Sequence, residues 1–176
     1  RTRVDSLPES YVNLYKYSQA LGARFRLFGN VNDLAKSDSI LKSLIEKWKE
    51  REFYLSLAGN QMLQHEFTKA SSYLEELEKL EAETYARKLM QCDVHFETGN
   101  YYAAKQLLDQ TNHNDYPWHF RKAKLEHHTG SLENAISHME QAAELAPPGS
   151  YLQQLALSNA ADLYVHEGNI KRASEL

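Results

Sequence analysis

The chain lacks the features of several protein classes. Its 176 residues contain one cysteine, four prolines and seven glycines. A single cysteine excludes an internal disulfide, and so few prolines and glycines disfavour a turn-rich β protein. No apolar run reaches the ~20 residues that a membrane-spanning helix needs, and none follows the basic start to form a signal peptide. We therefore expect a soluble chain without a membrane span, and one reduced thiol fits either the cytosol or an exported protein whose signal has been removed.

Neither sign of charge dominates the sequence. Twenty Lys and Arg residues stand against 24 Asp and Glu residues, which gives a net charge of −4, and the two signs are interspersed. This balance argues against an electrostatic grip on phosphate backbones, so we expect no nucleic-acid partner. The abundant residues are Leu, Ala, Glu, Lys and Gln, which are good helix formers. The composition therefore predicts an all-α fold.

One small-residue spacing occurs four times along the chain. Each time, a small residue is followed twelve positions later by Ala, in the pairs Ala58 and Ala70, Cys92 and Ala104, Ala123 and Ala135, and Ala161 and Ala173. Small residues on two neighbouring helices let the helices approach closely. A glycine before the second helix, as at Gly99, Gly130 and Gly168, suits the end of the first helix. The spacing therefore predicts helix pairs, which must stack because one pair cannot bury its apolar face alone.

The predicted pairs divide the chain into approximate repeats at residues 8–50, 51–82, 83–114, 115–148 and 149–176. A Ser-x-x-Glu capping box at residues 6–9 predicts the start of the first helix, which Gly29 ends near Phe28. The second helix is expected from Leu34 to Trp48, and Trp48 is expected to belong to its buried stripe. The two prolines at 147 and 148 cannot continue a helix and mark a boundary. The last repeat is cut short, so we expect a fragment of a longer protein.

These residues resemble the tetratricopeptide repeat. The shared pattern is Gly-x-aromatic-or-aliphatic-x-x-Ala, with a small residue twelve positions before that Ala and apolar residues four and seven after it. The likeness runs from about residue 8 to the end, although His65 replaces one turn glycine, and Phe25 and Ser37 occupy the small positions of the first pair. The long turn from Gly29 to Leu34 and the Pro-Pro-Gly link look like a group of bacterial tetratricopeptide proteins that mostly lack an assigned activity. The resemblance implies one right-handed superhelix, an α-solenoid of antiparallel helix pairs, over residues 1–176.

The resemblance also implies a concave groove lined by the outward-facing residues of each first helix. Carried onto this sequence, the groove positions are Arg26, Gly59, Met62, Asp93, Phe96, Glu97, Phe120, Lys124, His127, Ser158, Asp162 and Val165. Two interpretations are open: aromatic anchors and polar contacts for a partner segment, or a solvated face whose aromatics complete the packing. The Lys and Asn pattern with which some family members grip a C-terminal carboxylate is not matched at Leu55, Gly59, Leu89 and Asp93.

Two further ligands are alternatives. His127, Asp162 and His166 could bind Zn²⁺ in a metal-binding or enzymatic accessory protein if all three converged. The neighbouring His128 points ~100° away from His127 on a helix, so surface histidines are the simpler interpretation. A small apolar ligand held between Phe96 and Phe120 would instead make the chain a helical carrier.

The sequence shows no catalytic constellation with its supporting context. There is no nucleophile elbow, phosphate-binding Gly loop or paired carboxylate cleft, and Cys92 occupies a packing position where burial should raise its pKa. We expect Asp115 to cap a helix and Trp118 to fill a junction. The favoured hypothesis is a non-catalytic protein–protein interaction scaffold that holds a protein or peptide partner in its groove, without a cofactor or metal. A homodimer through the open C-terminal end is also expected as an alternative.

Overall fold

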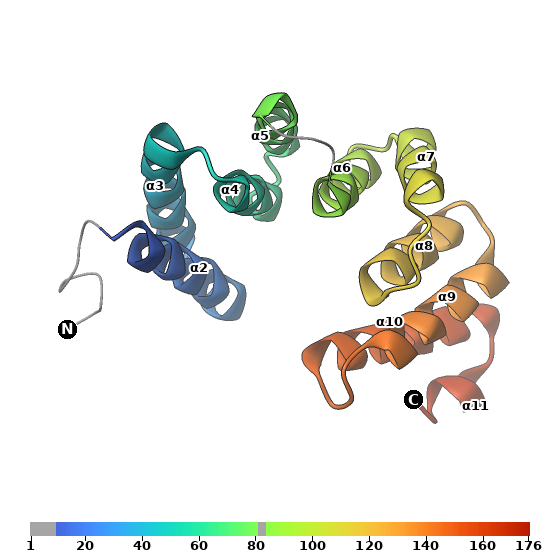
Figure 1. The fold of residues 1–176 in the computed structure, drawn as a ribbon. Coiled ribbons are helices and arrows are strands. Elements are labelled where there is room, and N and C mark those ends of the chain that lie inside the picture. Colours follow the sequence, from blue (N-terminus) through green and yellow to red (C-terminus); the bar gives the residue numbers. More distant parts are fainter. Residues whose placement is uncertain (1–9, 81–83) are drawn as a thin grey trace. The chain divides into compact units, whose positions relative to one another are not determined.

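The computed structural model describes residues 10–80 and 84–176, and within them every regular element is an α-helix (Figure 1). The helices are α2 (Tyr11–Phe28), α3 (Val31–Trp48), α4 (Arg51–Leu63), α5 (Phe67–Leu80), α6 (Tyr85–Glu97), α7 (Tyr101–Thr111), α8 (Tyr116–His128), α9 (Leu132–Leu145), α10 (Tyr151–Glu167) and α11 (Ile170–Ala173). The all-α prediction is confirmed. The predicted capping box at residues 6–9 lies outside the described residues. None of the described helices is both long and apolar enough to cross a membrane.

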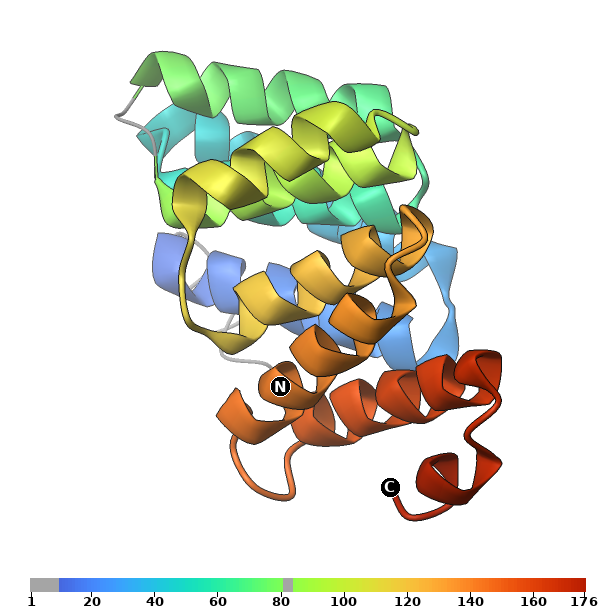
Figure 2. The same cartoon turned by 90° about the vertical axis from the view of Figure 1, so that its right-hand side faces the viewer.

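The chain divides into two compact units, Arg1–Met90 and Gln91–Leu176, and the boundary falls within α6. In the N-terminal unit, α2 packs on α3 and α4 packs on α5, with α3 also against α4. In the C-terminal unit, α9 packs between α8 and α10 (Figures 1 and 2). Each unit is therefore built from helix pairs joined by short turns, as predicted, while a single domain over all 176 residues stays a prediction.

The turn between α2 and α3 is shorter than the sequence suggested. Gly29 ends α2 in the left-handed conformation, at φ 68°, and its N–H donates to the Phe25 carbonyl over 2.7 Å. The Asn30 side chain then accepts from the backbone N–H of Asn32 at 3.1 Å. Because this cap satisfies a free amide of the first turn, α3 begins at Val31 and not at the expected Leu34.

The first helix pair is longer than the second. Helices α2 and α3 have 18 residues each, whereas α4 and α5 have 13 and 14. The added length places Leu27, Phe28 and Val31 around the turn, where they are 77%, 76% and 70% exposed. Trp48, expected in the core, is 38% exposed. It lies with Tyr11 at the end of the pair away from the turn, where the centroids of the two rings are 5.5 Å apart.

The small residues of the repeated spacing are buried in three of the four pairs. The six side chains that are at most 3% exposed are those of Ala58, Ala70, Cys92, Ala104, Ala123 and Ala135. In the fourth pair, Ala161 and Ala173 are only half-buried, and Ala160 is fully buried instead. The physical reason is that α11 has four residues and covers little of α10, so α10 buries the side that faces α9.

The junction before α8 forms as predicted. The Asp115 carboxylate accepts from the backbone N–H of Trp118 at 3.0 Å and caps the helix. The buried Trp118 donates its indole N–H to the Leu108 carbonyl at 2.9 Å, which ties α8 to the end of α7. At the proline link, α9 ends at Leu145 and α10 begins at Tyr151. Local capping and the two prolines therefore set these helix boundaries.

Candidate functional site

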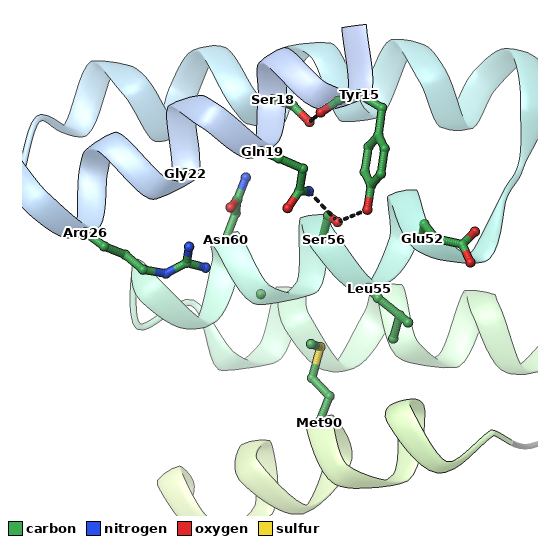
Figure 3. Close-up of a pocket in the computed structure, with 11 residues that line it drawn as sticks. Tyr15, Ser18, Gln19, Gly22, Arg26, Glu52, Leu55, Ser56, Asn60 and Met90 are labelled. Atoms are coloured by element: carbon green, nitrogen blue, oxygen red, sulfur yellow. Dashed lines mark hydrogen bonds between the residues drawn. The ribbon is translucent and has the colours of Figure 1, made fainter. Parts of the chain in front are cut away.

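The N-terminal unit carries a hollow of about 270 Å³ on its first-helix side (Figure 3). It is lined by Tyr15, Ser18, Gln19, Gly22 and Arg26 of α2, by Glu52, Leu55, Ser56, Gly59 and Asn60 of α4, and by Met90 of α6. On α2 and on α4 these residues follow one another at steps of one, three or four, which places them on one face of each helix. We call this hollow the α2–α4 pocket. Its volume lies just below the range of about 300–1,000 Å³ that is typical of small-molecule sites.

Hydroxyl and amide groups join the two main walls of the pocket. The Tyr15 hydroxyl lies 3.1 Å from the Ser56 Oγ, and the Gln19 side-chain amide donates to the same oxygen at 2.8 Å (Figure 3). The Ser18 hydroxyl donates to the Tyr15 carbonyl at 2.7 Å. The two contacts with Ser56 join α2 to α4, whereas the Ser18 bond lies within α2.

A buried polar network lies behind the α4 wall. The Asn60 Nδ2 donates to the Ser37 Oγ at 2.9 Å and to the Asp38 Oδ1 at 2.8 Å. The other oxygen of Asp38 accepts from the Gln61 amide at 2.7 Å and from the Gln64 amide at 3.0 Å. A buried carboxylate needs such donors because it has lost water. The network therefore fixes the position of the Asn60 side chain in the pocket wall.

The two charged residues of the pocket lie toward its opposite ends (Figure 3). Glu52 pairs with Arg51, at 3.1 Å between Oε1 and Nη2. A backbone hydrogen bond at its own residue, followed by that guanidinium, holds the pKa of Glu52 below its usual range. Arg26 is exposed and forms no ion pair or hydrogen bond with any residue of the described ranges. Among the residues that the structure describes, the pocket therefore offers one cation, Arg26, that has no ion-pair partner.

The corresponding face of the C-terminal unit is closed by its own side chains. Arg121 donates to both oxygens of Asp93, at 2.8 and 2.5 Å. The Lys124 Nζ lies 4.6 Å from the centre of the Phe96 ring and 3.5 Å from the Glu97 carboxylate. The space left beside Phe96 has a volume of about 10 Å³, enough for about one water molecule.

Phe120 serves the core of the C-terminal unit. It is half-buried, stacks on Tyr116 with ring centroids 5.5 Å apart, and packs against the cluster around Ala123 and Met139. It does not line the small space beside Phe96. A space of about 10 Å³ is far too small for an apolar ligand, so the space beside Phe96 does not support the carrier hypothesis.

Two of the three proposed metal ligands meet. The His127 Nε2 lies 3.2 Å from the His166 Nδ1, and both residues are exposed. Asp162 does not complete the set, because the described part of the chain holds no group of three or more His, Cys, Asp or Glu side chains placed to bind a metal. Protein zinc sites normally use three or four such ligands, so the hypothesis lacks its third ligand.

The remaining predicted groove positions lie elsewhere. Ser158, Asp162 and Val165 are exposed on α10, and Met62 is half-buried on α4 outside the α2–α4 pocket.

Cys92 is a packing residue, as its place in the repeat predicted. It is 3% exposed, and its sulfur lies 3.6 Å from the Ala104 carbonyl of the partner helix. Burial, and then the nearby charge of Asp93, raise the pKa of the thiol to about 12. The thiolate is the reactive form, so this cysteine is unsuited to nucleophilic chemistry near neutral pH.

Sequence reasoning placed only Arg26 and Gly59 in the α2–α4 pocket and missed the rest of its lining. The missed residues include Tyr15, Gln19, Glu52, Ser56, Asn60 and Met90. Counting back from Arg26 in steps of three and four along α2 would have found Gly22, Gln19 and Tyr15. No such count signals Asn60, because its orientation depends on Asp38 of another helix.

Comparison with known proteins identifies the fold. No family model and no curated protein matches this chain. A thermophilic TPR protein of Thermus thermophilus superposes with a TM-score of 0.75 over 93% of this chain and 86% of its own, at 16% identity. The fold is that of a tetratricopeptide repeat protein. The chain is thus an all-α solenoid of antiparallel helix pairs, as the sequence predicted.

Two other solved structures share the tetratricopeptide fold. The APC/C hetero-tetramer Cut9–Hcn1 superposes with a TM-score of 0.78 at 18% identity, and the match covers 97% of this chain but 33% of that one. YrrB, described as a TPR protein with an unusual peptide-binding site, superposes with a TM-score of 0.55 at 18% identity, over 98% of this chain and 85% of its own. At such identities the likeness establishes the fold alone.

Proposed function

We propose that this tetratricopeptide chain is a non-catalytic interaction scaffold and that the α2–α4 pocket holds a segment of a partner protein. The observation that carries the proposal is an open hollow of about 270 Å³ whose walls combine apolar, amide, hydroxyl and cationic groups. Pockets of mixed lining with a few oriented polar groups are typical of recognition sites. The description of YrrB as having a peptide-binding site is consistent with this use of the fold.

The lining suggests the chemistry of the bound segment. Leu55 and Met90 offer an apolar surface for one side chain, and Gln19, Ser56 and Asn60 offer hydrogen-bonding groups beside it. Arg26 at one end, which pairs with no acidic side chain of the described part of the chain, favours an acidic residue of the partner. Because Arg26 is exposed, its contribution is mainly to orientation and association rate, with a modest share of the affinity.

We place the main contact in the N-terminal unit because its groove positions are available to a ligand. The C-terminal positions Asp93 and Lys124 are engaged with Arg121 and with Glu97 and Phe96. Using them would require breaking those contacts first. The exposed residues His127, Ser158 and Asp162 remain accessible to a weaker secondary contact.

The proposal is tested by selecting peptides from a random phage-displayed library on the immobilised chain and measuring their affinity by titration calorimetry. Arg26→Glu should weaken an acidic selected peptide about tenfold, which corresponds to ~1.4 kcal/mol. Lys16→Glu is the matched control, because Lys16 is an exposed cation of α2 that does not line the pocket. Its affinity should equal that of the wild type.

Two results would contradict the proposed function. One is a library that enriches no binding sequence. The other is a selected peptide that ignores Arg26→Glu but is lost on Lys124→Glu, which would move the site to the C-terminal unit.

A further inference from the structure

Two of the seven glycines have no backbone reason to be glycine. The other five adopt positive φ at turns or helix ends; they are Gly29, Gly99, Gly130, Gly149 and Gly168. Gly22 and Gly59 instead lie inside α2 and α4, where glycine weakens a helix relative to alanine. Both line the α2–α4 pocket.

Helix packing does not require these two glycines either. A Cβ atom built on Gly22 would find only the Asn60 Oδ1 nearby, at 3.6 Å, and one on Gly59 would find only the Met90 Cε, at 3.9 Å. Both are ordinary contact distances, and no neighbouring backbone comes close. The missing side chains therefore leave room in the pocket and not between packed helices.

The side-chain oxygen of Asn60 is a hydrogen-bond acceptor that faces the space beside Gly22. The residue is 6% exposed, and the two hydrogens of its amide nitrogen are donated to the Ser37 hydroxyl and the Asp38 carboxylate. The orientation is not interchangeable, because the Asp38 carboxylate can only accept and the Ser37 hydroxyl already donates to the Ser18 carbonyl at 3.1 Å. The Asn60 Oδ1 therefore faces the space in front of Gly22, and no described residue donates to it. The residue is largely buried, but this oxygen is accessible from the pocket, where a ligand can donate to it.

We infer that the partner segment crosses Gly22 and Gly59 with its main chain and donates a peptide N–H to the Asn60 Oδ1. This inference rests on the proposed function and names the ligand class as an extended peptide. A helical segment fits poorly, because its backbone N–H groups are bonded internally and its side chains keep the backbone several Å away. Glycine on the receiving surface is what allows a backbone to approach closely. Asp38 and Ser37 act as positioning residues that keep the acceptor aimed at the ligand.

Gly22→Ala tests the inference by separating stability from binding. The added methyl group should cover the Asn60 Oδ1, so the affinity of the library-selected peptide should fall at least about tenfold. The melting temperature should stay at or above that of the wild type, because alanine favours the helix and its Cβ has room. Ser39→Ala is the control: it makes a similar helix-favouring change at an exposed site of α3 and should leave the affinity unchanged.

A second measurement uses the peptide itself. Copies of the selected peptide that are methylated on one backbone nitrogen at a time are titrated into the wild type and into Gly22→Ala. One N-methyl position should cost at least about tenfold in the wild type, and the same change should cost little in Gly22→Ala, where the bond is already lost.

The outcomes distinguish this inference from the proposed function. A peptide that depends on Arg26 but tolerates N-methylation at every position and binds Gly22→Ala normally would overturn the inference and leave the scaffold function intact. A library that yields no binding peptide overturns both.

Discussion

The first-helix faces of the two units differ in what their side chains do. In the N-terminal unit the face is hollow, and Arg26 has no ion-pair partner in residues 10–80 and 84–176. In the C-terminal unit the face is filled, with Arg121 bound to Asp93 and Lys124 placed over Phe96. Both faces are built by the same kind of helix, so the repeat determines where a groove position lies but not whether it is available to a ligand.

The contrast can be followed at single positions of the repeat. The residue directly after the buried small residue is Gly59 in α4, Asp93 in α6 and Lys124 in α8. The residue two places before the buried small residue is Ser56 in α4 and Arg121 in α8. Small side chains leave a hollow at these places, whereas long charged ones reach their neighbours and close the surface.

The largest stability effect should come from removing the carboxylate behind the pocket. Asp38→Ala removes one acceptor from each of the buried or half-buried amides of Asn60, Gln61 and Gln64, so we expect a loss of ~3 kcal/mol or more in the free energy of unfolding. Urea unfolding followed by circular dichroism measures it. Asp162→Ala, at an exposed position of α10, should change stability by less than ~0.5 kcal/mol. Equal effects of the two changes would mean that the network does not support the pocket wall.

A matched pair of arginine substitutions separates the open face from the closed one. Arg121→Met leaves the Asp93 carboxylate, which is 26% exposed, without its partner and should cost ~1–2 kcal/mol. Arg26→Met should cost less than ~0.5 kcal/mol, because no ion pair with a described residue is lost. Parallel denaturant titrations compare them. The contrast between the faces breaks down if Arg26→Met proves the more damaging change.

Cys92→Ala tests whether the C-terminal unit keeps the repeat register. Because Ala58 and Ala123 fill the equivalent positions, we expect a loss of only ~1 kcal/mol at pH 7. The wild type should also lose stability as the pH rises from 9.0 toward about 12, because the thiol ionises in the unfolded chain before it does in the folded one.

The loss of folding stability at alkaline pH that comes from ionisation of the thiol should be absent from Cys92→Ala. Free energies of unfolding measured at pH 8, 9.5 and 10.5 give the slope for both proteins, and it can reach ~1.4 kcal/mol per pH unit. Identical slopes would show that the thiol is not buried in solution.

The smallest effect is expected at the long first pair. Phe28 is 76% exposed at the α2–α3 turn, so Phe28→Ser should change the free energy of unfolding by less than ~0.5 kcal/mol. Thermal melts of the variant and the wild type measure this, with Leu57→Ala, at a fully buried position of the same unit, as the contrasting change of ~2–5 kcal/mol. A loss above ~1 kcal/mol for Phe28→Ser would indicate that this side chain is covered in solution.

Sequence reasoning succeeded where short-range physics decides the structure. Asp115 capped its helix and Trp118 filled its junction as predicted, because both depend on residues close by in the chain. It was wrong for Ala161, since a four-residue α11 covers little of α10, and for Trp48, which ended at the surface beside Tyr11. The first error comes from assuming that each repeat has a full-length neighbour to pack against.

The sequence by itself determined that the chain folds into helix pairs, where most of those helices end, and that Cys92 is a packing residue. Periodicity, capping residues and small-residue spacing suffice for this, because they act within a few turns of helix or one repeat. Only the tertiary structure decided which face is open. That depends on contacts such as Arg121 with Asp93 and Asn60 with Asp38, whose partners lie 28 and 22 residues apart and meet only when neighbouring helices pack.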